Sequence, residues 1–164
     1  MGGDMIITVA DLGDGVVDGL DVLELATAVL ARNFELLRRR SDVYTELDKA
    51  EYLLLRTLDQ LGPTDIGSLA AAVGLDPSTA GRQVAGMESR DLVDRTLSPD
   101  DRRRSMIAPT EAGRQRMTAT RARRRTATAE MLADWTDQEL QQLGDLLTRY
   151  NKAIADRYLQ PDKD

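Results

Sequence analysis

Hydrophobic side chains recur at helical spacing over most of this chain, and short stretches rich in turn residues separate the periodic segments. A first helix is predicted to begin near Asp18. Arg38-Arg39-Arg40 closes it with cations at the negative end of the helix dipole. One face of this helix carries an apolar stripe that consists of Leu23, Ala26, Leu30, Phe34 and Leu37.

Helix start signals follow in close succession. Asp48 with Glu51 three residues later forms the pattern of a capping box, and Gly62-Pro63 marks the end of that helix. Thr64 or Asp65 is expected to cap a short helix over 66–73, with Gly74 as its stop. Asp76-Pro77 opens a third helix that is predicted to run to about Arg90, with a buried face made of Ala80, Val84 and Met87.

A hairpin is predicted after these helices. Residues 92–97 favour a strand, Ser98-Pro99-Asp100 favours a turn, and residues 105–108 favour a returning strand that ends at Pro109. Helix, turn, helix and then a charged hairpin is an order that suits a chain placing one helix in a DNA groove.

Two long helices are predicted at the end of the chain. Thr110 caps the first, from Glu111 to about Ala133, and Thr136 with Glu139 forms a second capping box. The last helix carries an apolar stripe of Leu140, Leu143, Leu147, Tyr150, Ile154 and Tyr158.

Composition narrows the chemistry. The chain is 41% hydrophobic but only 4% aromatic, so its core must consist mainly of aliphatic side chains. Cysteine and histidine are both absent, which excludes disulfides, cysteine redox sensing and the ordinary zinc or copper ligands. Because the usual general base and thiol nucleophile are also missing, we expect no enzyme, no catalytic residues, no cofactor and no metal. A hydrolase or metal enzyme that uses carboxylates, Lys or Tyr, with Mg²⁺ held by Asp100-Asp101, is a distant alternative.

Targeting signals are also missing from the sequence. No apolar run approaches 18 residues, and residues 5–10 are too short and too acidic in their flanks for a secretory signal. A protein with no membrane association, located in the cytoplasm, is therefore expected.

The charge of the chain is unevenly distributed. Residues 76–125 hold 12 Arg against 7 Asp or Glu, whereas the rest holds 10 Lys or Arg against 21 Asp or Glu. Local potential, rather than the net charge of −6, attracts a polyanion. Four of the arginines fall within 121–125, where an exposed face paired with acidic residues is favoured over a phosphate contact.

Residues 20–158 resemble the multiple antibiotic resistance regulator (MarR) family of bacterial transcription factors. The hairpin carries the resemblance through Asp101-Arg102-Arg103, then Met106 and Ile107, then Thr110-Glu111-Ala112-Gly113. Ile66-Gly67-Ser68-Leu69-Ala70 and Asp76-Pro77-Ser78-Thr79 match its helix-turn-helix. The resemblance implies a mainly α fold with a small β-hairpin wing, a winged helix-turn-helix with N- and C-terminal dimerisation helices.

The predicted organisation has five parts. A flexible arm covers 1–17, an N-terminal dimerisation helix 18–45, the winged helix-turn-helix DNA-binding domain 46–113, C-terminal dimerisation helices 114–158, and a tail 159–164. Asp91, Pro109, Gly81 and Gly86 depart from the family pattern. Asp91 stands at a position expected to need a left-handed backbone, and each glycine costs about 1 kcal/mol of helix propensity against Ala.

Two groups of residues are predicted to bind DNA. The first turns of the recognition helix supply the candidate base contacts, which are Ser78, Thr79, Arg82 and Gln83. Ser78 and Thr79 are equally well interpreted as capping residues. By the resemblance, Asp101 braces Arg103 in the minor groove while Arg102 and Arg104 contact phosphates, and Arg95 is a further phosphate candidate.

The terminal helices are expected to pair two copies, because their apolar stripes must be buried against something. The predicted interface residues are Leu23, Leu30, Leu140, Leu143, Leu147, Tyr150 and Ile154. The resemblance also implies a small aromatic or anionic effector, for which Arg38, Arg40 and Tyr52 are weak candidates.

The sequence therefore predicts a homodimeric, double-stranded DNA-binding repressor of transcription with a near-palindromic operator, released by an effector. The alternative is a winged-helix protein-interaction module in which the acidic body and the arginines bind other proteins.

Overall fold

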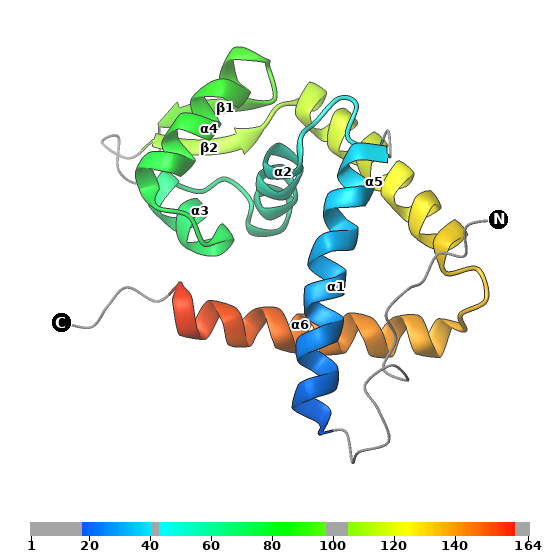
Figure 1. The fold of residues 1–164 in the computed structure, drawn as a ribbon. Helices are drawn as coiled ribbons and strands as arrows, with labels where there is room; N and C mark the ends of the chain where they lie inside the picture. Colours follow the sequence, from blue (N-terminus) through cyan, green and yellow to red (C-terminus); the bar gives the residue numbers. More distant parts are fainter. Residues whose placement is uncertain (1–17, 41–42, 98–104, 160–164) are drawn as a thin grey trace. The chain divides into compact units, whose positions relative to one another are not determined.

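The computed structural model describes residues 18–40, 43–97 and 105–159, without the side chains of Arg38 and Arg40. The chain divides into two compact units, residues 1–42 and 43–164. The first contains α1 (Gly19–Arg40). The second contains, in chain order, α2 (Lys49–Leu61), α3 (Ile66–Val73), α4 (Pro77–Ser89), β1 (Val93–Leu97), β2 (Ser105–Pro109), α5 (Glu111–Met131) and α6 (Asp137–Tyr158) (Figure 1).

The helices of the second unit begin where the cap residues predicted them. The carboxylate of Asp48 accepts the amide of Glu51 at 2.8 Å, and the carboxylate of Glu51 accepts the amide of Asp48 at 2.9 Å, so the capping box is complete. Of the two candidates for α3, Asp65 is the cap. Asp76, Thr110 and Thr136 cap α4, α5 and α6 as expected.

The helix ends agree with the expectations to within two residues. Gly74 stops α3 in the left-handed conformation at φ 71°, which glycine adopts without a steric penalty. The recognition helix α4 ends at Ser89, with Arg90 as its C-terminal cap, and α5 ends at Met131 instead of about Ala133. Such differences are usual because the last turn of a helix frays.

The predicted hairpin is present. β1 and β2 are antiparallel, with Val93 opposite Pro109 and Leu97 opposite Ser105. Pro109 is the last residue of its strand, as its missing N–H requires. Ile107 also exchanges two backbone hydrogen bonds with Thr64, at 2.8 and 3.1 Å, which attaches the hairpin to the start of the helix-turn-helix.

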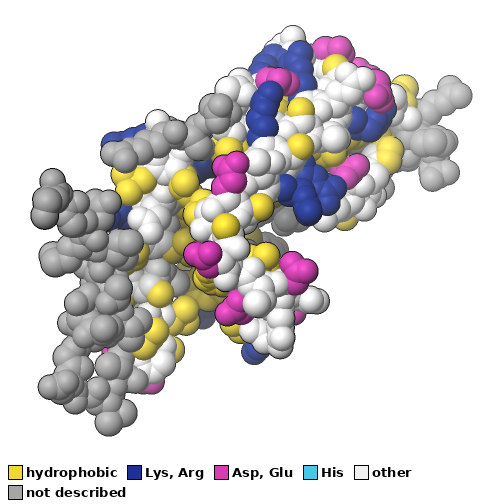
Figure 2. Space-filling view, turned by 90° about the vertical axis from the view of Figure 1, so that its right-hand side faces the viewer, with side chains coloured by type: hydrophobic (Ala, Val, Ile, Leu, Met, Phe, Trp, Pro, Cys, Tyr) yellow, Lys and Arg dark blue, Asp and Glu magenta, His cyan; other side chains and the backbone are white. Residues whose placement is uncertain are grey.

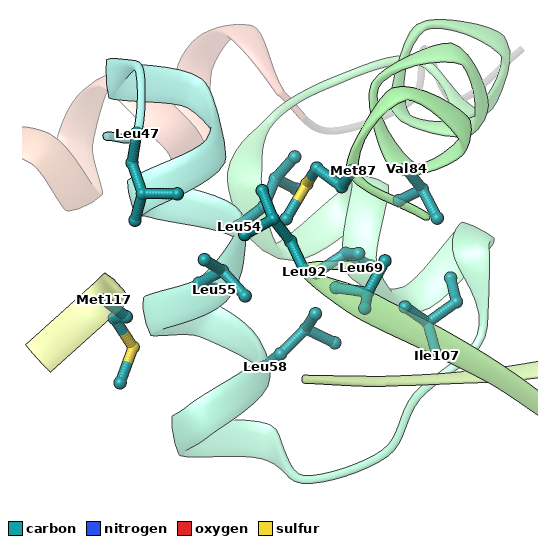
Figure 3. Packing of buried hydrophobic residues seen from close by; sticks show 11 residues of the cluster. Leu47, Leu54, Leu55, Leu58, Leu69, Val84, Met87, Leu92, Ile107 and Met117 are labelled. Atoms are coloured by element: carbon teal, nitrogen blue, oxygen red, sulfur yellow. The ribbon is translucent and has the colours of Figure 1, made fainter. Parts of the chain in front are cut away.

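A single core lies between α2, α3, α4, the hairpin and the start of α5. Its buried members come from each of these elements, and Figure 3 shows how Leu54, Leu58, Leu69, Val84 and Ile107 converge from α2, α3, α4 and β2. The predicted inner face of α4, made of Ala80, Val84 and Met87, is buried as expected. This core, formed within the second unit, holds the recognition helix in place.

The long terminal helices are different. Within the described part of the chain, none of the 22 residues of α6 is buried. Hydrophobic side chains are also exposed on α1, where Leu20 is 72% and Phe34 51% accessible. Figure 2 shows that hydrophobic side chains reach the surface at several places on one face of the molecule. Among the described helices, none is long and apolar enough to cross a membrane.

Candidate nucleic-acid interface

The first turn of α4 is held by Asp76. Its Oδ1 accepts the hydroxyl of Ser78 at 2.5 Å and the amide of Thr79 at 2.9 Å. These hydrogen bonds, with that of the Ser78 hydroxyl the largest contribution, hold the pKa of Asp76 well below its usual range. The start of the recognition helix is therefore ordered before any ligand arrives.

Arg82 lies on the exposed side of α4 and points back toward this turn. Its Nη2 donates to the hydroxyl of Thr79 at 3.0 Å. The structure thus brings Ser78, Thr79 and Arg82 together at one end of the helix. The hydroxyls of Ser78 and Thr79 are engaged with Asp76 and Arg82, which fits a capping role and leaves base contact by these residues a prediction.

Gln83 is placed less favourably. Its side chain is half-buried, and Oε1 is enclosed without a hydrogen-bond partner among the described residues. An amide that reads adenine must present both its oxygen and its nitrogen to the base. Gln83 must therefore change its rotamer before it can make the predicted contact.

The two glycines of α4 do not serve packing. An added Cβ at Gly81 or at Gly86 would meet no heavy atom within 4 Å. The outer side of the recognition helix is therefore open at both positions. Steric crowding therefore does not explain why glycine stands at these two positions.

The wing is fastened to the other end of α4. Arg95 on β1 donates through Nε to Oε2 of Glu88 at 2.9 Å. Arg95, one of the residues predicted to contact a phosphate, therefore already forms an ion pair within the protein. Asp101, Arg102, Arg103 and Arg104, the candidates at the hairpin tip, lie outside the described residues.

Asp91 connects α4 to the wing in the left-handed conformation, with φ 57°, as its position in the family pattern predicted. The hydroxyl of Thr110 donates to the carbonyl of Asp91 at 2.7 Å and accepts the amide of Gly113 at 2.9 Å. The amide of Thr110 donates to the carbonyl of Leu92 at 3.1 Å. Thr110 therefore joins the end of α4, the start of β1 and the start of α5.

Gly113 has a role that the sequence did not reveal. A Cβ at this position would lie 2.0 Å from the carbonyl oxygen of Leu92, so only glycine allows α5 to approach β1 this closely. The only signal available from the sequence was the Thr-x-x-Gly spacing itself, which was interpreted as a helix start.

Tyr52 belongs to an aromatic group at the base of α2. Its ring meets that of Tyr44 edge to face, with centroids 6.4 Å apart. The guanidinium of Arg124 lies 5.2 Å from the Tyr52 ring and 5.4 Å from the Tyr44 ring, within the range of a cation–π contact. The other two effector candidates cannot be placed, because the side chains of Arg38 and Arg40 lie outside the described residues.

The sequence did not predict that three arginines make hydrogen bonds to other segments of the same protein. Arg90 donates to Glu51, and Arg123 donates to Oε1 of Glu46 at 3.1 Å. Arg124 donates to the hydroxyl of Tyr44. The preference for paired arginines within 121–125 agrees with the contact between Arg123 and Glu46, but the individual partners are far away in the sequence.

Comparisons with known proteins agree with this architecture. The model of the MarR family matches residues 47–105. The uncharacterized HTH-type transcriptional regulator YxaD of Bacillus subtilis (strain 168) is 40% identical over 110 residues, which are 67% of this chain and 77% of that protein.

Solved structures show the same fold. The PcaV transcriptional regulator from Streptomyces coelicolor, in complex with its natural ligand, has a TM-score of 0.62 at 26% identity, covering 85% of this chain and 98% of that one. A MarR family protein from Bacillus stearothermophilus has a TM-score of 0.66 at 20% identity, covering 85% and 99%. With its helix-turn-helix, its wing and its similarity to these regulators, the chain belongs to the MarR family of transcription regulators, which bind DNA and are not enzymes.

Proposed function

We propose that this protein is a dimeric repressor that binds a near-palindromic operator and is released by a small aromatic or anionic effector. The observation that carries DNA reading is the ordered first turn of α4, where Asp76 fixes the backbone and Arg82 remains exposed. A guanidinium held at the start of a recognition helix can donate two hydrogen bonds to guanine, worth about 1–3 kcal/mol of discrimination.

The inner face of α4 supports the same proposal. Because Ala80, Val84 and Met87 are buried, the helix presents a defined outer face and binding requires little rearrangement. The wing strand is joined to this helix through Arg95 and Glu88, so helix and hairpin approach DNA as one surface. Arg95 itself contacts a phosphate in this proposal, while Arg102, Arg103 and Arg104 extend the contact beyond the described residues.

The exposed stripes of α1 and α6 support a homodimer. Leu23, Leu30, Leu147, Tyr150 and Ile154 are each between 37% and 45% accessible, and Leu140 and Leu143 are half-buried. Contiguous apolar surface of this kind is seldom left in water. A two-fold dimer presents two recognition helices to half-sites about 10 bp apart, which requires a near-palindromic operator.

An effector site is proposed around Tyr52, and Arg38 and Arg40, whose side chains lie outside the described residues, remain candidates from the sequence alone. Tyr44, Tyr52 and Arg124 provide aromatic surface and a positive charge at one place. PcaV, a structural relative at 26% identity, was solved with its natural ligand. An effector acts here only through different affinities for the DNA-competent and DNA-incompetent states.

DNA binding is tested by fluorescence anisotropy with duplexes from the region upstream of the protein's own gene, together with light scattering. We expect a complex of two protomers per operator, and Arg82→Ala should relax the base preference at one position in each half-site. A folded monomer at micromolar concentration contradicts the dimer. No binding in dilute buffer contradicts the repressor and leaves the protein-interaction module as the alternative.

The wing is tested separately. Arg103→Ala should weaken operator binding and reduce the slope of log affinity against log salt by about 0.9, because one cationic contact in the minor groove is lost. Arg103→Lys is the matched control, since it keeps the charge and should keep the slope. Unchanged affinity and slope in Arg103→Ala would reject the assignment of the wing.

A further inference from the structure

The segment Val43–Asp48, called the linker below, opens the second unit and connects it along the chain to the unit that contains α1. Arginines from two other elements contact it. Arg90, the C-terminal cap of α4, donates through Nη2 to the backbone carbonyl of Glu46 at 2.7 Å. Arg123 on α5 donates to the Thr45 hydroxyl at 2.5 Å and to the Glu46 carboxylate at 3.1 Å.

Arg90 also binds a carboxylate at the start of α2. Its Nη1 donates to Oε1 of Glu51, whose side chain is only 11% accessible. The other oxygen of this carboxylate accepts the amide of Asp48, the last residue of the linker. Glu51 is therefore shared between its own helix cap and the end of the recognition helix.

This arrangement has a specific geometric requirement. Arg90 uses two nitrogens of one planar group to reach two acceptors on different segments, which the single ammonium group of lysine cannot reproduce with the same geometry. Removing Arg90 would leave the nearly buried carboxylate of Glu51 without its cationic partner, a costly condition in a protein interior. The contact is thus a directed connection between an exposed guanidinium, with the Arg90 side chain 45% accessible, and a nearly buried carboxylate.

Arg90 stands at the opposite end of α4 from the turn that Asp76 caps. The 13 residues of α4 separate Asp76 from Arg90, and the 14 steps between them amount to about 21 Å along the axis. The ends of the recognition helix therefore have separate tasks. In the proposed function the first turn faces DNA, and the C-terminal cap Arg90 attaches the helix to the linker.

We propose that Arg90 is a positioning residue for DNA binding, which acts with Glu51 by fixing the C-terminal end of the recognition helix to the linker that leads to α1. The inference rests on the proposed DNA-binding function. Any change in the course of the linker then changes the direction in which the recognition helix points. Arg123 holds the same linker to α5, so two helices of the second unit share this attachment.

The decisive variants are Arg90→Gln and Glu51→Gln. The glutamine at position 51 can still accept the amide of Asp48, so it preserves the helix cap while it removes the charge that faces Arg90. Arg56→Gln is the matched control, because Arg56 loses the same charge but pairs only within α2, with Asp59 at 3.3 Å. All variants are measured at a temperature where circular dichroism shows the native helix content.

We expect Arg90→Gln and Glu51→Gln each to weaken operator binding about tenfold, and the double variant to be no weaker than either alone. The salt slope should stay at its wild-type value, because no phosphate contact is lost. Arg56→Gln should bind like the wild type, and Arg90→Lys should not restore affinity. If Arg90→Gln lowers both the operator affinity and the salt slope while Glu51→Gln has no effect, Arg90 is a phosphate contact and the proposal is overturned. Wild-type affinity in both variants would also overturn it.

Hydrogen exchange tests the attachment without DNA, so failure of the proposed function is separable from failure of this inference. In Arg90→Gln, amides of the linker and of the last turn of α4 should exchange faster together, while those of α3 keep wild-type rates. Unchanged protection in the linker would overturn the attachment even if the wild-type protein binds an operator. If the wild type binds no operator but the coupled exchange is present, the proposed function fails and the attachment stands without its role in DNA binding.

Discussion

Leucines are buried in one region of this molecule and exposed to solvent in another. In the winged helix-turn-helix, Leu55 on α2 and Leu69 on α3 have no accessible surface. On α6, Leu146 is 59% accessible, and on α1, Leu20 is 72% accessible. Both regions have helical apolar stripes, but only the first closes its stripe within one chain.

The difference separates two sources of stability. Burial of a leucine contributes about 1.5–3 kcal/mol, and the core around α2 obtains this from contacts inside the protomer. The stripes of α1 and α6 obtain it only when another surface covers them. The stability of the DNA-binding unit should therefore be independent of protein concentration, whereas the stability of the terminal helices should depend on it.

The largest expected effect compares Leu55→Ala with Leu147→Ala. Leu55→Ala should lower the free energy of unfolding by about 4 kcal/mol, since it leaves a cavity in a closed core. Leu147→Ala should mainly weaken dimerisation. Urea denaturation at two protein concentrations distinguishes them. A cost of Leu147→Ala that is independent of concentration would show that α6 is stabilised within one protomer.

Gly113→Ala tests how closely the core is packed at its edge. The new methyl group would collide with the carbonyl of Leu92, and we expect a loss of about 3 kcal/mol in the free energy of unfolding. Ala112→Gly is a control for the loss or gain of helix propensity at the neighbouring position. Wild-type stability in Gly113→Ala would mean that α5 can move away from β1 at little cost.

Thr120→Val tests the one described threonine hydroxyl that is enclosed without a hydrogen bond. Because an unsatisfied buried hydroxyl is costly, valine of similar shape should raise stability by about 1 kcal/mol. The exposed Thr126→Val on the same helix should change little. Thermal unfolding measures both, and a lower melting temperature for Thr120→Val would point to a partner for this hydroxyl.

The smallest expected effect concerns the open side of α4. Gly81→Ala and Gly86→Ala should each raise stability by about 0.5–1 kcal/mol, since alanine favours the helix and meets no neighbour. Operator affinity is measured alongside stability. If affinity falls while stability rises, the glycines serve the fit to DNA rather than the fold.

Local signals explain how much of the fold the sequence predicted. Asp48, Asp76 and Thr110 begin helices through hydrogen bonds to residues three positions away, so these helix starts can be recognised from a short stretch of sequence. The buried face of α4 follows from helical spacing in the same way. These features depend on short stretches of chain and little on tertiary context.

Contacts between distant segments were not predictable in this way. Arg90 and Glu51 are 39 positions apart, and Arg123 and Glu46 are 77 apart, so no spacing rule relates them. Glu51 was expected only as a capping residue, although it also binds Arg90. The cap at Asp76 lies where the sequence predicted it, whereas the inward placement of Gln83 was not predicted, and base contact by residues 78–83 stays a prediction.

The joint that Thr110 makes has a mechanical consequence. It fixes the first turn of α5 to the segment where α4 ends and β1 begins, and the whole of α5 extends over 21 residues, about 31 Å. Because Met117 and Arg123 also attach α5 to the same unit, the helix and that unit tilt together, by about 2° for each ångström that the far end of the helix moves sideways. Small displacements near Met131 thus become rotations of the whole winged helix-turn-helix, and α5 acts as a lever arm.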